Sequence, residues 1–74
     1  MIMILFENYN LSDLPTIVAD DIVIHANPDA RPFNLSNNNE FYLEGYGNSS
    51  VGLNKISMHE IALSLSKHNR VELL

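Results

Sequence analysis

Cysteine is absent from the 74-residue chain, so neither a disulfide bridge nor a thiolate metal site can stabilise it. A domain of this length buries only about 60% of the surface that its unfolded chain exposes. The hydrophobic core is therefore small, and we expect a single compact domain over residues 1–74. Self-association or a bound partner is the remaining source of added stability.

Basic residues are scarce: the chain has 4 Lys and Arg against 9 Asp and Glu, for a net charge of −5 at pH 7. The excess lies in the first thirty residues, which carry no Lys or Arg. The acids of this part are Glu7, Asp13, Asp20, Asp21 and Asp29. Proteins that bind nucleic acid directly need clustered Lys and Arg for phosphate contacts. The charge distribution instead favours a partner with a basic surface, although acidic residues also serve simply to keep surface turns soluble.

Long hydrophobic runs are also missing. Met1–Phe6 is apolar and then meets Glu7, without a basic segment or a small-residue cleavage site. A membrane-spanning helix needs about 20 apolar residues, and a secretory signal needs both of those flanking features. We therefore expect no membrane partner and a cytoplasmic location. The run is typical of a β-strand that is covered on both faces at the centre of a sheet.

Several further segments have the pattern of β-strands. Thr16–Ala19 and Ile22–His25 are β-branched runs separated by two aspartates, which predicts a hairpin or one long strand with a bulge. Glu40–Tyr46 alternates apolar and polar residues, as a half-buried strand does. Val51–Ile56 can return antiparallel to it, and Arg70–Leu73 alternates as a short last strand.

The clearest local signal is a helix start at Ser57. Its hydroxyl can accept a hydrogen bond from the Glu60 N–H, while the Glu60 side chain can reach back to the Ser57 N–H. Ile56 and Ile61 are spaced to pack on each other across this first turn. The pattern predicts a helix from Met58 to about His68.

The helical spacing defines a core face and an opposite, polar face. The core face consists of Met58, Ile61, Ala62, Leu65 and His68. Leu63 falls on the polar side, where an exposed leucine is either ordinary or a dimer contact. Together the segments predict a small α+β domain. Its mainly antiparallel sheet has about four to five strands, with the helix, about residues 58–68, packed on one face.

The sequence offers little for chemistry. His25, His59 and His68 lack the i, i+4 spacing of a helical zinc pair. Asp20 and Asp21 would point to opposite faces of a strand, so they could share a cation or a proton only within a turn. We therefore predict no metal, no cofactor and no catalytic residues.

A glycine-containing segment, Gly45–Gly52, resembles a phosphate-binding loop. The motif requires Lys followed by Ser or Thr after its last glycine, and Leu53 and Asn54 stand there instead. The glycines are better explained as turn residues.

Tyrosines supply large amphipathic contact area and are enriched at protein interfaces. Tyr42 and Tyr46 lie with Glu44 on the outward face of their predicted strand; an alternative is that the tyrosines cover the second face of the sheet. The full set of predicted partner-binding residues is Asp20, Asp21, Asp29, Tyr42, Glu44, Tyr46 and Leu63.

The leading hypothesis is a non-catalytic protein-interaction module. One version is a small acidic inhibitor of phage type, which docks on a basic, nucleic-acid-binding surface of a host defence or transcription complex in the host cytoplasm. Asp20, Asp21 and Asp29 would then stand in place of phosphates. One alternative is a self-assembling structural or accessory subunit, such as a homodimer, that uses a strand edge and Leu63. Another is a small metal-dependent enzyme centred on the histidines and the paired aspartates.

Overall fold

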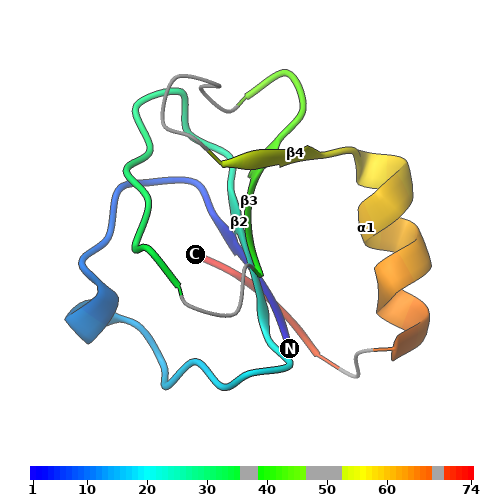
Figure 1. Cartoon of the computed structure of the whole chain (residues 1–74), viewed down its shortest axis with the longest axis horizontal. Coiled ribbons are helices and arrows are strands. Elements are labelled where there is room, and N and C mark those ends of the chain that lie inside the picture. The colour runs from blue at the N-terminus through cyan, green and yellow to red at the C-terminus, as the bar shows by residue number, and fades with distance from the viewer. Residues whose placement is uncertain (36–38, 47–52, 68–69) are drawn as a thin grey trace.

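The computed structural model describes residues 1–35, 39–46, 53–67 and 70–74 (Figure 1). Together they form one sheet, one α-helix and short 3-10 turns. The strands are β1 (Ile2–Leu5), β2 (Ile22–His25), β3 (Glu40–Leu43), β4 (Asn54–Ile56) and β5 (Val71–Leu73). The helical elements are η1 (Leu11–Asp13), α1 (Met58–Ser64) and η3 (Leu65–Lys67).

All neighbouring strands run parallel, in the order β4-β3-β2-β1-β5. The expectation of a mainly antiparallel α+β sheet is therefore wrong, and the domain has a small α/β fold. Parallel neighbours need a crossover connection of about a dozen residues or more. The described parts of the connections that follow β1 and β2, residues 6–21 and 26–35, are largely irregular loops on one side of the sheet (Figure 1). The usual sequence signal of a parallel sheet, strands alternating with helices, is thus missing from the first half of the chain.

The predicted hairpin or long strand before β2 does not form. Residues 15–18 are irregular, and a turn at residues 19–20 leads into β2. The Asp21 carboxylate accepts a hydrogen bond from the Val18 N–H at 2.9 Å, which folds this segment back locally. Ile17 packs against the buried side chains of Met3, Leu5 and Val23. Thr16–Ala19 is therefore not a strand of the sheet, in spite of its β propensity.

Two other strands differ from the prediction in length or direction. β3 ends at Leu43, and residues 44–46 form a turn in which Gly45 has a φ of +86°. Glycine adopts positive φ without the steric cost that other residues meet. β4 lies parallel to β3, and the first residues of the predicted strand Val51–Ile56 lie outside the described residues.

The sheet is covered on both sides. The helix side holds a core of Ile2, Ile4, Ile24, Ala26, Leu43 and Ile56 from the strands with Ile61 from α1. On the other side, the loop side, Met3, Leu5 and Val23 lie beneath apolar residues of the loops and termini, namely Met1, Tyr9, Leu14, Ile17, Phe33, Leu35 and Leu74. β1 contributes to both cores, which confirms that the first apolar run is an inner strand.

The helix begins where the sequence predicts. The Ser57 hydroxyl accepts from the Glu60 N–H at 3.1 Å and donates to Glu60 Oε1 at 3.2 Å, so the Glu60 side chain meets the hydroxyl and not the Ser57 N–H. Ile56 and Ile61 share the helix-side core, as expected. The α-helical part ends at Ser64 and continues as η3. The predicted end at His68 lies outside the described residues.

The predicted core face of the helix is mostly uncovered. Ile61 is the one buried residue of α1, whereas Met58 is 63% and Leu65 44% exposed. A helix of seven residues is about 10 Å long, and five strands about 4.8 Å apart span about 19 Å. One short helix therefore contacts a small part of the sheet and leaves much of its own apolar stripe open.

Candidate functional site

A buried histidine and a buried glutamate meet on the loop side of the sheet. His25 is the last residue of β2, and Glu40 is the first residue of its neighbour β3. His25 Nε2 lies 3.0 Å from Glu40 Oε1, and the two side chains are 3% and 4% exposed. Glu40 stands opposite Val23 in the parallel register, so its side chain reaches along the sheet to the ring. Each group supplies the partner that the other needs when it is removed from water.

Phe33 joins this pair to the loop that follows β2. Its N–H donates to both carboxylate oxygens of Glu40, with a distance of 3.1 Å to Oε2. Its ring packs edge-on against the His25 imidazole, with centroids 5.2 Å apart and planes inclined by 64°. The pair therefore holds the segment between β2 and β3 on the sheet.

The hydrogen-bond network assigns the proton on the His25 ring. Because the Glu40 carboxylate accepts from the Phe33 N–H with both oxygens, it acts as an acceptor, and Nε2 of His25 is the donor. In the neutral ring, Nδ1 is then an acceptor. Nδ1 makes no hydrogen bond within the described residues, which contain no fully buried side-chain nitrogen or oxygen without a partner. Nδ1 therefore belongs to the small part of the ring that solvent reaches.

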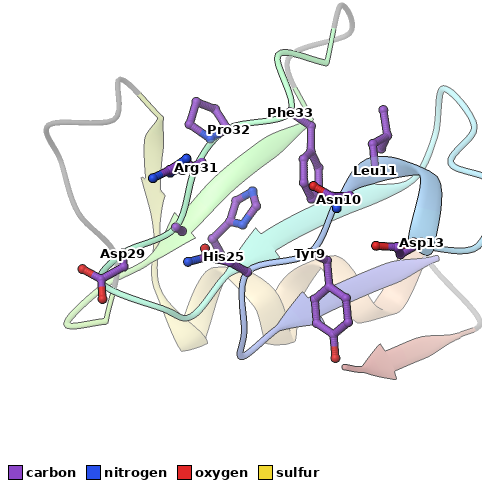
Figure 2. Close-up of a pocket in the computed structure, with 11 residues that line it drawn as sticks. Tyr9, Asn10, Leu11, Asp13, His25, Asp29, Arg31, Pro32 and Phe33 are labelled. Carbon is purple, nitrogen blue, oxygen red and sulfur yellow. The ribbon is translucent and has the colours of Figure 1, made fainter.

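The accessible part of His25 borders a cavity of about 720 Å³. Its walls come from the loops that follow β1 and β2. Its polar and aromatic wall residues include Tyr9, Asn10, Asp13, Asp29, Arg31 and Phe33 (Figure 2). Figure 2 shows His25 between the two loops. Ligands of open parallel sheets bind outside the carboxyl ends of the strands, and the two loops that line this cavity leave the sheet at the carboxyl ends of β1 and β2.

The predicted acidic contact residues do not share one edge of the sheet. Asp20 and Asp21 precede β2, at the amino ends of the strands, whereas Asp29 follows β2, at their carboxyl ends. Asp21 is also buried, with Oδ1 3.0 Å from the amino-terminal nitrogen and Oδ2 bonded to the Val18 N–H. These positions do not gather the three carboxylates into a phosphate-like surface. Docking as a nucleic-acid mimic stays a prediction that the geometry does not favour.

The other predicted contact residues are dispersed as well. Tyr42 is half-buried on the loop side of β3, while Glu44 and Tyr46 lie in the exposed turn beyond it. Glu44 Oε1 is 3.8 Å from the Lys55 Nζ. Leu63 is 61% exposed on α1. Because β3 ends before Glu44, the side chains of Tyr42, Glu44 and Tyr46 do not form the single outward face that the alternation predicted. The binding role of these residues and of Leu63 stays a prediction.

The edge strand β5 exposes apolar side chains on the helix side. Among the described strands it pairs with β1 alone and ends the sheet. Val71 and Leu73 stand opposite Ile2 and Ile4, whose side chains belong to the helix-side core, and residues opposite in register share a face. Val71 is 40% and Leu73 66% exposed. The apolar surface of the sheet therefore continues past the area that α1 covers. We call these two residues, with their backbone, the β5 edge.

Neither the His25–Glu40 pair nor the β5 edge follows from sequence pattern alone. No local rule links His25 with a glutamate 15 positions away. One signal was present: His25 closes an apolar run, and a polar residue in a buried strand needs a partner. The open edge follows only from the strand order.

Two other features are absent from the described residues. They contain no group of three side chains of the metal-binding type. No helix among them has the length and apolar character needed to cross a bilayer. Comparison of the chain with protein-family models, with curated proteins and with solved structures finds no match.

Proposed function

We propose that this protein is a non-catalytic, cytoplasmic protein-interaction module that associates through the β5 edge. The observation that carries the proposal is a strand edge that no other described strand pairs and that has exposed apolar side chains. Such an edge is a template for the addition of a further strand. The proposal keeps the predicted class, protein binding, but moves the contact surface away from the acidic residues.

The backbone of β5 presents hydrogen-bonding groups outward. The Arg70 carbonyl accepts from the Ile2 N–H at 2.9 Å, and the Leu74 N–H donates back to β1 at 2.8 Å. Alternate residues of a strand bond to the same neighbour. The N–H and C=O groups of Val71 and Leu73 therefore point away from β1, toward an added strand.

A second copy of the chain fits this edge. Two β5 strands related by a two-fold axis at Val71 run antiparallel, with Val71 opposite its own copy. Arg70 of each chain then lies opposite Glu72 of the other. Cross-strand pairs of opposite charge stabilise a sheet, and Arg70 and Glu72 already pair within one chain. Charge complementarity therefore favours self-association over an unrelated partner.

Light scattering over a range of protein concentrations tests the proposal. The natural sequence should pass from monomer to dimer as concentration rises. Val71→Pro removes an outward N–H and no bond to β1, so it should shift the equilibrium toward monomer while the circular dichroism spectrum is retained. A natural chain that stays monomeric throughout, or a dimer that Val71→Pro leaves intact, contradicts the proposal.

Two lysine substitutions at similarly exposed leucines identify the surface. Leu73→Lys and Leu63→Lys place the same charge at residues that are 66% and 61% exposed. Only Leu73→Lys should weaken the dimer. If Leu63→Lys alone weakens it, the contact lies on α1 and the β5 edge is excluded.

A charge exchange tests the register. Arg70→Glu brings two acidic residues together across the proposed interface and should weaken the dimer. The double variant Arg70→Glu/Glu72→Arg restores opposite charges and should recover it. If the double variant is no better than Arg70→Glu, the two strands do not meet in this register.

A further inference from the structure

We propose that the cavity beside His25 binds a small, neutral, polyhydroxylated molecule, such as a sugar or a cyclic polyol, one hydroxyl of which donates a hydrogen bond to Nδ1 of His25. This site is separate from the β5 edge. It therefore stands or falls independently of the proposed self-association.

His25 is a preorganised acceptor. Its ring is held through Nε2 by Glu40 at 3.0 Å and from the side by Phe33, while Nδ1 is not fully buried and His25 lines the cavity. A buried polar group that is fixed by its neighbours loses little entropy when a ligand binds to it. A ligand hydroxyl is a suitable donor for the nitrogen lone pair.

The charges around the cavity favour a neutral ligand. Asp13 and Asp29 place two carboxylates in its walls, and Arg31 places one guanidinium there. None of these three side chains forms an ion pair within the part of the chain that the structure describes. An anionic ligand would meet more carboxylates than cations, whereas phosphate sites gather Arg and Lys.

A polyol uses both kinds of polar group in the walls. Each hydroxyl donates one hydrogen bond and accepts others, so carboxylates can accept from it while Arg31 and the amide of Asn10 donate to it. Phe33 adds apolar ring surface. The cavity volume of about 720 Å³ lies within the range of roughly 300–1,000 Å³ that is typical of small-molecule sites.

An NMR titration of the full chain tests the site. Glucose, galactose and myo-inositol are each added alone, and inorganic phosphate and ethanolamine serve as charged comparisons. A neutral polyol should cause saturable shifts of the His25 ring signals and of the amides of the two cavity loops. The nitrogen-15 shift of Nδ1 should move toward that of a hydrogen-bonded acceptor. Absence of saturable shifts with every neutral probe, or saturation only by a charged one, overturns the proposal.

Substitution of an exposed wall residue avoids any loss of folding through His25 itself. Asp13→Asn should weaken polyol binding about tenfold, as expected for one lost charge-assisted hydrogen bond. Asp20→Asn makes the same change at an exposed aspartate that does not line the cavity and should leave binding unchanged. Equal effects of the two substitutions would show that the shifts do not report this cavity. Val71→Pro should bind the polyol as the natural chain does.

Discussion

His25 and Glu40 lie on neighbouring strands with Nε2 and Oε1 3.0 Å apart and both side chains buried. The pair holds the Phe33 backbone through Glu40, and its histidine lines the cavity. It therefore links the stability of the fold with the shape of the candidate site.

Removal of the carboxylate should be costly. Glu40→Ala leaves the His25 ring and the Phe33 N–H without their acceptor inside the protein. Loss of one member of a buried pair typically costs about 3–5 kcal/mol, and we expect a fall of that order in the urea-derived free energy of unfolding. Glu44→Ala removes an exposed glutamate four positions later and should change it by less than about 0.5 kcal/mol. Similar values for the two variants would refute the structural role of the pair.

The adjacent aspartates should differ sharply in their effect on stability. Asp21→Ala deprives the Val18 N–H and the amino-terminal nitrogen of a buried acceptor, which should cost about 1–3 kcal/mol. Asp20→Ala changes an exposed turn residue and should be nearly neutral. Thermal unfolding of both variants measures the contrast. An equal loss would mean that Asp21 is not held as described.

The helix should depend on one apolar residue. Ile61→Ala removes the single buried side chain of α1 and should cost about 2–5 kcal/mol. Leu63→Ala, on the exposed side of the same helix, should cost little beyond a helix-propensity change, which is small for leucine to alanine. The comparison is made by chemical denaturation. If Leu63→Ala is as harmful as Ile61→Ala, the helix packs through a different face.

The cap at Ser57 should contribute about 1 kcal/mol, the usual cost of replacing an N-cap serine with alanine. For a domain of this size, such a loss lowers Tm by about 4–8 °C. Ser66→Ala removes a hydroxyl of η3 that donates to the Leu63 carbonyl of α1, and it serves as the matched serine control. We expect a clearly smaller shift of Tm for Ser66→Ala.

Local features of the fold were predictable where a few adjacent residues determine them. Ser57 and Glu60 specify the helix start, and the apolar run in β1 specifies a strand buried on both faces. Strand direction was not predictable, because Asp20 and Asp21 suggest a tight turn between two strands. In the structure Asp21 instead closes a local turn on Val18. Parallel pairing depends on how long loops cross the sheet, and no short sequence pattern records that.

The candidate sites were harder to predict for the same reason. Charge asymmetry along the sequence does not give positions in space. Asp20 and Asp29 both lie in the acidic part of the sequence, but one precedes β2 and the other follows it. The wall of the cavity combines residues that follow two different strands, and His25 meets Glu40 only because β2 and β3 are neighbours. Such juxtapositions require the strand order, which the sequence pattern does not contain.

The first and last strands in the sequence are neighbours in the sheet, since β1 pairs with β5 and the Phe6 N–H donates to the Leu74 carbonyl. During translation, β1 can therefore acquire its second neighbour only after residues 71–73 have been synthesised and have left the ribosome. A nascent chain can assemble β1 to β4 earlier, but one side of β1 remains unpaired. Contacts between residues so distant in sequence slow folding, and the nascent intermediate exposes an apolar strand to other chains until β5 is available.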